Sequence, residues 1–207
     1  RGEREFGMSL YWIFDAVRHF GVEEAQHVVE QAIHFKDRNV VGIGLGGDER
    51  RAEPGQFREV YEHAAGNGLR LTAHAGETVG PESIWGALRE LKAERIGHGL
   101  HATDDTELVR YLAEKQIPVE VCITSNVLTG CCAEAERHPI RRLFEAGVLV
   151  TLNTDDPDMF RTTLVHEYQI AQQVFGFSEA ELCELAKNSF RASFLPETKK
   201  QEMLSKF

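Results

Sequence analysis

The 207-residue sequence lacks any apolar run that approaches the roughly 18 to 20 residues a membrane-spanning helix needs. Its first five residues are mostly charged and lead into no short apolar stretch with a cleavage site. We therefore expect neither a membrane span nor a signal peptide in this chain. Hydrophobic residues make up 42% and charged residues 27%, which is typical of a globular domain with a substantial core.

Clusters of basic residues are also missing. Asp and Glu outnumber Lys and Arg by 33 to 23, which gives a net charge of −10. Such a surface repels phosphate backbones, and the basic runs are no longer than pairs such as Arg141-Arg142 and Lys199-Lys200. The sequence therefore predicts no nucleic-acid partner.

Cysteine is scarce, and its spacing excludes a common kind of metal site. None of the four cysteines belongs to a Cys-x-x-Cys pair, and adjacent Cys131-Cys132 would make a poor structural zinc site. Cys122 lies inside an apolar run and is predicted to be a small buried hydrophobe. This usage is typical of a reducing cytoplasm, where we expect the protein to be located.

Short β-rich runs alternate with segments of helical periodicity. Residues 22–37 place apolar side chains on one helical face, and Ser178 with Glu181 has the spacing of a capping box. Gln56–Asn67 is followed by Gly68, a suitable C-terminal cap, and Pro81–Ala93 opens with proline. The alternation predicts a parallel sheet flanked by helices. The predicted strands are Met8–Phe14, Val40–Leu45, Leu69–Ala73, Arg95–Ile96, Pro118–Thr124 and Val148–Leu152.

An open doubly wound sheet and a closed barrel both fit this alternation, and the positions of the chemically reactive residues favour the barrel. Barrel enzymes build their sites from the carboxyl ends of many strands, whereas an open sheet gathers ligand contacts mainly at one switch point. Five of the six predicted strands end in such residues: Gly46–Glu49, His74–Glu77, Gly97–Gly99, Thr124–Asn126 and Thr154–Asp156. We expect a single TIM-type (β/α)8 barrel domain over residues 1–207. Because six predicted strands are two short of eight, we also expect about the first two β/α units to be missing at the N-terminus.

The segment His74-Ala75-Gly76-Glu77 combines two groups that metal-assisted hydrolysis requires. A histidine at a strand end offers an imidazole to a metal ion, and a glutamate past a flexible glycine turns back to move protons beside it. The alternative is a buried histidine bonded to a backbone carbonyl, with Glu77 as a charge at a helix N-terminus.

Three further segments repeat this pattern. Asp155 and Asp156 are adjacent carboxylates that a metal ion would compensate, although an N-cap before Pro157 explains them equally well. His98 lies between two glycines, as a general base or an oxyanion stabiliser requires, although it fits an ordinary loop histidine too. Gly47 offers a bare backbone amide to a flat ligand, or forms a plain strand-to-helix turn. In this order, each at a strand end, the simpler alternatives become improbable together.

These segments resemble the adenosine deaminase family of zinc-dependent aminohydrolases. The resemblance runs from about residue 6 to about residue 205 and implies an eight-stranded β/α barrel. The matching segments are Val40–Glu49, His74–Glu77, Arg95–Gly99, Val119–Asn126 and Thr151–Pro157.

The resemblance also implies a role for each candidate residue. His74 and Asp155 would be zinc ligands, and Glu77 would carry a proton to the purine ring nitrogen. His98 would orient the zinc-bound water and help to deprotonate it. Asp156 and the Gly47 backbone would hold the purine.

The sequence departs from the family pattern in two places. The family's other two zinc ligands form a His-x-His pair on the first strand, and no His-x-His occurs in this chain. Gly44-Leu45-Gly46-Gly47 stands where typical adenosine deaminases carry Asp-Leu-Ala-Gly. This form is similar to that of the aminodeoxyfutalosine deaminases, relatives that accept an adenine nucleoside with a bulky 5′ extension.

The resemblance implies zinc-dependent deamination of a 6-aminopurine nucleoside, such as adenosine to inosine and ammonia, or of a 5′-extended analogue. Two alternatives stay open: a non-catalytic purine-binding barrel, and a related hydrolase of another cyclic amidine or amide. The zinc deaminases of nucleic-acid bases use His-x-Glu with Pro-Cys-x-x-Cys, and neither element is present.

Overall fold

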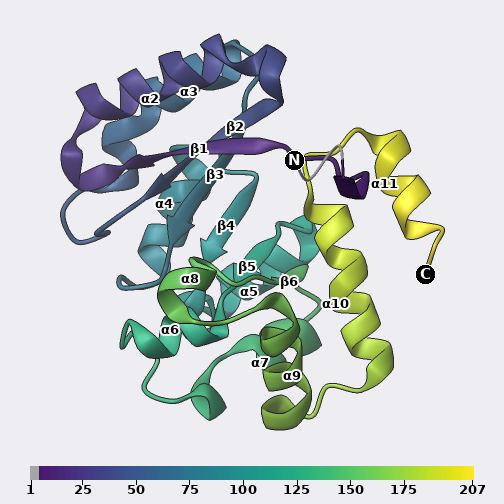
Figure 1. The fold of residues 1–207 in the computed structure, drawn as a ribbon. Coiled ribbons are helices and arrows are strands. Elements are labelled where there is room, and N and C mark those ends of the chain that lie inside the picture. Colours follow the sequence, from purple (N-terminus) through teal and green to yellow (C-terminus); the bar gives the residue numbers. More distant parts are fainter. Residues whose placement is uncertain (1–4) are drawn as a thin grey trace.

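The computed structural model describes residues 5–207, and its centre is a sheet of six parallel strands (Figure 1). The order of the strands in the sheet is their order in the sequence. A doubly wound sheet reverses its strand order at a switch point, so the unbroken order agrees with the predicted β/α barrel. The strands are β1 (Trp12–Val17), β2 (Val40–Gly46), β3 (Arg70–Ala75), β4 (Arg95–His98), β5 (Val119–Val121) and β6 (Val150–Leu152).

Helices follow the strands, as the predicted alternation requires. The α-helices are α2 (Val22–His34), α3 (Arg58–Gly66), α4 (Pro81–Arg89), α5 (Thr106–Lys115), α6 (Ile123–Leu128), α7 (Ile140–Glu145), α8 (Pro157–Phe160), α9 (Leu164–Phe175), α10 (Glu179–Ala192) and α11 (Glu197–Leu204). Short 3-10 turns are η1 (Arg18–Phe20), η2 (Lys36–Arg38), η3 (Pro54–Phe57), η4 (Leu100–Asp104) and η5 (Ala135–Arg137). Helix α2 packs against β1 and β2, α3 against β3, and α10 against β6.

Most predicted elements are confirmed, with shifted ends. The capping box of Ser178 and Glu181 opens α10, and Gly68 follows α3 with a left-handed φ of +74°. Strands β3 and β4 run further than predicted, so His74 and His98 lie within strands and not after them. Helix α4 ends earlier than predicted, at Arg89.

Two predicted strands have wrong boundaries. The first strand is Trp12–Val17, not Met8–Phe14, because Asp15 does not end it: its side chain lies over glycines of β2 and the pairing continues. The fifth strand stops at Val121, and α6 begins at Ile123, so the end of the run Pro118–Thr124 is helical. Burial of Ile123 inside the fold overrides its preference for a strand.

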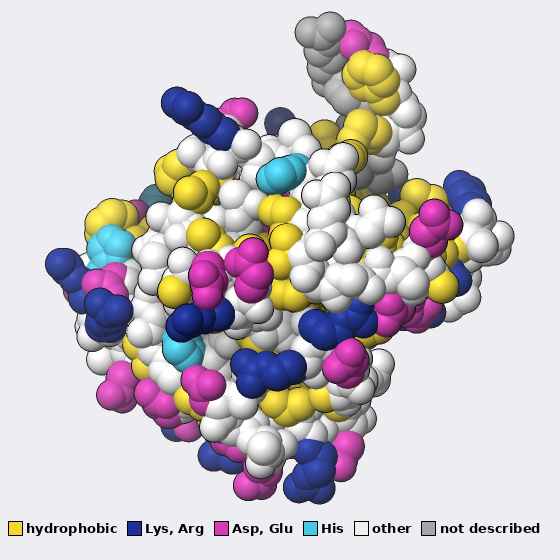
Figure 2. All heavy atoms as spheres, turned by 90° about the horizontal axis from the view of Figure 1, so that it is seen from below, with side chains coloured by type: hydrophobic (Ala, Val, Ile, Leu, Met, Phe, Trp, Pro, Cys, Tyr) yellow, Lys and Arg dark blue, Asp and Glu magenta, His cyan; other side chains and the backbone are white. Residues whose placement is uncertain are grey.

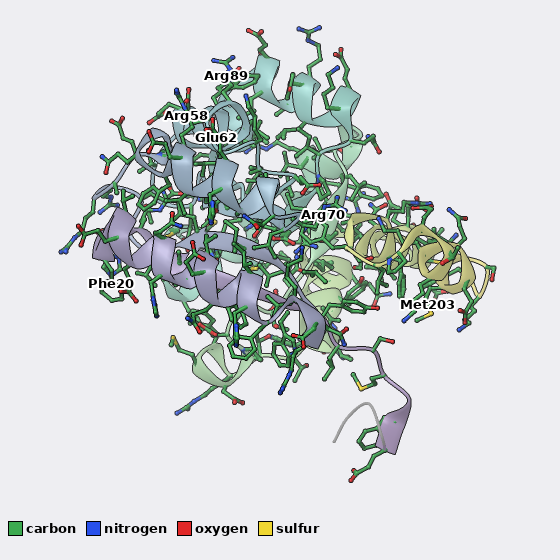
Figure 3. All side chains as sticks on the ribbon, turned by 90° about the horizontal axis from the view of Figure 1, so that it is seen from above. Phe20, Arg58, Glu62, Arg70, Arg89 and Met203 are labelled. Carbon is green, nitrogen blue, oxygen red and sulfur yellow. The ribbon has the colours of Figure 1, made fainter. Side chains whose placement is uncertain are left out.

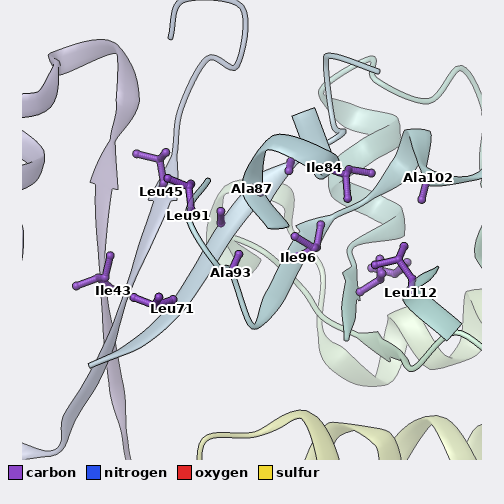
Figure 4. Packing of buried hydrophobic residues seen from close by; sticks show 14 of the residues in the cluster. Ile43, Leu45, Leu71, Ile84, Ala87, Leu91, Ala93, Ile96, Ala102 and Leu112 are labelled. Carbon is purple, nitrogen blue, oxygen red and sulfur yellow. The ribbon is translucent and has the colours of Figure 1, made fainter. Parts of the chain in front are cut away.

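The main core lies between the sheet and the helices (Figure 4). Ile43 and Leu45 of β2 lie on the face of the sheet that the helices cover, and both are almost fully buried. Ile96 of β4 and Ile84 of α4 are buried in the same core. Burying each such side chain contributes roughly 1.5–3 kcal/mol. Strand β2 therefore places its large side chains against the helices and its glycines on the opposite face.

The amino ends of β3 and β4 are covered by the chain between α10 and α11. Arg70 and Arg95 lie over the ring of Phe194, at 4.4 and 4.1 Å from its centroid, and Figure 3 shows Arg70 beside the C-terminal helices. Lys199 of α11 donates to the hydroxyl of Tyr11, just before β1. The C-terminal part of the chain therefore packs against the amino ends of β1, β3 and β4.

The surface carries charges of both signs. On the face shown in Figure 2, Lys and Arg side chains lie among Asp and Glu. Within residues 5–207, the helices are too short or too polar to cross a bilayer.

Candidate active site

Three candidate residues line one cavity of about 480 Å³ at the carboxyl ends of the strands. His74 comes from β3, His98 from β4, and Asp155 from the turn after β6. Glu77 lies beside them, since its Oε2 is 3.7 Å from Nε2 of His98. Oδ2 of Asp155 is 3.9 Å from the same nitrogen. The structure thus brings together four side chains that are distant in sequence.

The two histidine rings sit side by side because the strands carrying them are paired. His74 is in register with Gly97, and the ring centroids of His74 and His98 are 5.0 Å apart. A β-carbon on Gly97 would stand 3.4 Å from Cγ of His74. Glycine at this position therefore leaves room for the His74 ring beside β4.

His98 and Asp155 both adopt a left-handed backbone conformation, with φ of 63° and 57°. This region is uncommon for residues with side chains and persists only where surrounding contacts enforce it. Oδ2 of Asp155 accepts a hydrogen bond of 2.6 Å from Ser125, and the His98 ring contacts Asn126 at 3.1 Å. Helix α6 therefore holds both strained residues in place.

Glu77 is positioned by the loop that carries it. Gly76 has a φ of +70°, and a β-carbon there would lie 2.5 Å from the side chain of Ile84. The carboxylate of Glu49 accepts backbone N–H bonds from Glu77, Thr78 and Val79, at 3.4, 3.2 and 3.0 Å. Glu49 is only 6% exposed, so this anchor is shielded from water. The sequence analysis placed Glu49 in a candidate segment but assigned it no role.

The surroundings of Glu77 shift the protonation equilibrium of its carboxyl group. Burial raises the pKa of this carboxyl above its ordinary value, and the negative charges of Glu49 and Asp155 add to the rise, while His74 opposes it. A carboxylate with a raised pKa accepts a proton more readily than a free one and can pass that proton on.

The adjacent acids Asp155 and Asp156 are both exposed but differ in their hydrogen bonding. Asp155 is bonded to Ser125 as described, whereas Asp156 precedes α8 without any capping hydrogen bond from its side chain. Gly47, after β2, has a φ of +84°, and a β-carbon there would stand 2.8 Å from Nδ1 of His19. Neither Asp156 nor Gly47 is among the residues that line the cavity, so their part in binding a purine stays a prediction.

The donor set fits a metal ion in part. His74 and Asp155 face the same cavity and offer nitrogen and oxygen, which zinc accepts. One potential ligand atom each from His98, Cys122 and Asp155 lies within 4.8 Å of the others. Cys122 is buried, as predicted, and burial raises the pKa of its thiol well above the ordinary value. Two protein ligands from His74 and Asp155 are fewer than the three that catalytic zinc normally has.

Besides Glu49, sequence reasoning assigned no role to three further residues around the site. Asp15 of β1 covers Gly44 and Gly46 and lies near His74. Asn126 belonged to a candidate segment without a role, and His138 gave no signal apart from its residue type. All three act through contacts between elements far apart in sequence, which local patterns do not reveal.

Comparison with protein families gives a match over the whole chain. The profile described as "Adenosine deaminase" matches residues 1–207. An aminodeoxyfutalosine deaminase of Streptomyces avermitilis is 45% identical over 195 residues, which are 93% of this chain and 54% of that enzyme. The chain thus spans about half the length of this curated relative.

Solved structures of deaminases and related amidohydrolases superpose on this chain. Adenine deaminase from Arthrobacter aurescens superposes with a TM-score of 0.93 at 34% identity, over 98% of this chain and 62% of the other. An amidohydrolase from Burkholderia ambifaria, solved with bound zinc, gives 0.92 at 27% identity, over 98% and 57% of the two chains. The zinc-bound neighbour and the donor set together indicate a metal at this site.

Proposed function

The chain belongs to the adenosine deaminase family, and we propose that it serves the zinc-dependent hydrolytic deamination of a 6-aminopurine nucleoside. The observation that supports this most directly is the convergence of His74, Glu77 and His98 with Asp155 around one cavity. In this reaction water replaces the amino group at carbon 6 of the purine, and ammonia leaves.

His74 and Asp155 are the residues of this chain that would hold the zinc ion. When bound, zinc would lower the pKa of a water molecule toward about 7 and so supply a nucleophile at neutral pH. The resemblance assigns the two other ligands to a His-x-His pair, which this sequence does not contain. Ser125 fixes Asp155 by its hydrogen bond, which leaves the second carboxylate oxygen free for the metal.

Glu77 would move the proton. Its carboxyl reaches the same point as the His98 ring, and its raised pKa lets it hold a proton for the ring nitrogen of the purine. Protonation of the ring nitrogen while carbon 6 is attacked prevents negative charge from building up on the purine ring. Glu49 keeps Glu77 in reach through its three backbone bonds. Asp156 and the Gly47 backbone would hold the purine, with His98 orienting the attacking water.

For the substrate we propose an adenine nucleoside with a 5′ extension, as in aminodeoxyfutalosine. The 45% identical relative bears that activity in its name, and the match extends over 195 residues. Gly44 stands in place of an acid, and the carboxylate of Asp15 on β1 lies directly over it. The four free cysteines support a cytoplasmic location.

The test uses the protein expressed from its complete gene. Loss of ultraviolet absorbance is followed with adenosine, adenine and a 5′-extended adenine nucleoside, alongside metal content before and after a chelator. We expect turnover that is fastest on the extended nucleoside, disappears with the metal and returns with zinc. Tight purine binding without turnover in the zinc-loaded protein would favour a non-catalytic purine-binding barrel. Turnover of another cyclic amidine, without turnover of any adenine compound, would show that the protein is a related hydrolase with a different substrate.

A further inference from the structure

Behind His98 lies a chain of buried hydrogen bonds that ends at the backbone. Nδ1 of His98 is 3.1 Å from Nδ2 of Asn126, and Oδ1 of Asn126 is 3.2 Å from Nε2 of His138. The backbone N–H of Ile140 donates to Nδ1 of His138 at 3.2 Å. His98, Asn126 and His138 are 3%, 0% and 4% exposed, so water does not compete for these bonds.

The backbone end sets the direction of every bond in the chain. The N–H of Ile140 is always a donor, so Nδ1 of His138 has to accept. A neutral His138 then carries its proton on Nε2 and donates to Oδ1 of Asn126. The amide of Asn126 is left with its NH2 group toward His98, so Nδ1 of His98 accepts and the His98 proton sits on Nε2.

The reversed arrangement is unfavourable. Turning the amide of Asn126 would aim its NH2 group at the protonated Nε2 of His138, and two donors would face each other in a dry interior. A buried donor without an acceptor destabilises the fold. Charged rings are disfavoured too, because His98 and His138 are almost fully buried and a charge there would be shielded from water.

We infer that Asn126 and His138 are positioning residues that hold His98 as its Nε2–H tautomer, so that His98 donates a hydrogen bond into the site. An Nε2 that carries a proton neither accepts one from water nor binds a metal ion. This inference rests on the proposed function and limits the role that the resemblance implies for His98, because the ring then orients the water without taking its proton. His98 orients the attacking oxygen, and the proton that the water loses passes to the carboxylate of Glu77, 3.7 Å from Nε2.

The direct test is the tautomer of His98, read by long-range ¹H–¹⁵N NMR on the complete protein with ¹⁵N-labelled histidine, without and with zinc. We expect an unprotonated Nδ1 and a protonated Nε2 in both samples. A proton on Nδ1 of His98 overturns the inference, and so does loss of the Nε2 proton on zinc addition, which would make His98 a ligand.

A variant at Asn126 reverses the hydrogen bond that fixes the His98 tautomer. In Asn126→Asp a carboxylate replaces the NH2 donor, so it accepts from Nδ1–H of His98 and removes the proton from Nε2 or charges the ring. We expect the NMR signature to change and kcat to fall by about 10² to 10⁴, as for a histidine held in the wrong tautomer, with little change in KM. A normal kcat together with the changed tautomer overturns the inference.

Asn188→Asp is the matched control. Asn188 is 7% exposed and donates to the carbonyl of Val150 at 3.1 Å, away from His98. We expect this variant to keep the His98 tautomer and kcat within about threefold, whatever stability it loses. If Asn126→Asp does not fold, the unmodified protein still decides the question by NMR. The tautomer is measured without substrate. Absence of the proposed reaction and a His98 tautomer other than Nε2–H are therefore separate results.

Discussion

A β-carbon on Gly44 would lie 2.1 Å from Oδ1 of Asp15, the residue paired with it across β1 and β2. Another on Gly46 would lie 2.4 Å from Oδ2 of the same carboxylate. The Asp15 side chain therefore fills the space above two glycines of β2. Burial raises its pKa, while His74 and Arg18 oppose that rise. Position 44 on β2 carries no acid, but Asp15 on the neighbouring strand β1 places a carboxylate beside it.

This relationship predicts coupling between the two positions. We expect Gly44→Ala to destabilise the fold by about 1–3 kcal/mol, the usual cost of overpacking, because Asp15 has to move. In the double variant Asp15→Gly/Gly44→Ala the clash is gone, so the summed single effects exceed the double effect. Urea unfolding of the four proteins measures this. Gly66→Ala, where nothing lies within 4 Å of an added β-carbon, is the control. Strict additivity would contradict the coupling.

For the chemistry, the sharpest prediction concerns Glu77→Gln. The amide keeps the shape and the hydrogen-bonding reach of the side chain but cannot carry a proton. We expect metal content to stay at the level of the unmodified protein and turnover to fall by about 10² to 10⁴. Glu82→Gln, at an exposed carboxylate on α4, should leave both unchanged. Near-normal turnover in Glu77→Gln would show that another group moves the proton.

Much of the fold and the position of the site follow from local patterns. The alternation of strands and helices, the capping box at Ser178 and the left-handed glycine after α3 are read within short windows. Because the carboxyl ends of parallel strands meet at one rim, His74, His98 and Asp155 were expected to be neighbours before any distance was known. The cavity they share agrees with this expectation.

The features that the sequence did not reveal depend on contacts between distant elements. Asp15 looked like the end of a strand, because its glycine partners on β2 lie about thirty positions away along the chain. Ile123 looked like a strand residue, although helix α6 carries it into the core. The role of Glu49 needs the loop after β3, and that of His138 needs Asn126. Tertiary contacts decide each of these.

The anchor of the Glu77 loop leads to a third prediction. Glu49→Gln replaces one carboxylate oxygen by an NH2 group, which opposes the backbone donors of Thr78 and Val79. Hydrogen bonds to a charged group contribute about 1.5–3 kcal/mol, so we expect a stability loss of that order and a lower kcat as Glu77 loses its place. Faster amide hydrogen exchange at residues 77–79 is the local readout. Glu53→Gln, an exposed acid on the same loop, should change neither. Unchanged exchange in Glu49→Gln would contradict the anchor.

The last prediction is a loss of stability in mild acid, caused by the buried histidines. Burial lowers the pKa of His98 to about 4 and that of His138 to about 3, from an ordinary value of 6.5. Between pH 6.5 and the folded-state pKa of each histidine, the unfolded chain binds protons that the folded chain does not. Acidification in this range therefore favours unfolding. Their contribution is complete above pH 6.5 and is lost as the pH falls toward 4 and 3.

Each histidine then costs about 2 kcal/mol of stability between roughly pH 7 and pH 5, at about 1.4 kcal/mol per pH unit. The acids act in the opposite sense, because burial raises the pKa values of Asp15 and Glu77 and stability falls as the pH rises through them. Urea unfolding at several pH values measures the net slope. His138→Gln removes one titrating ring, so its slope should be shallower by about one histidine's share. An equal slope in both proteins would mean that His138 takes up its proton in the folded state as readily as in the unfolded one.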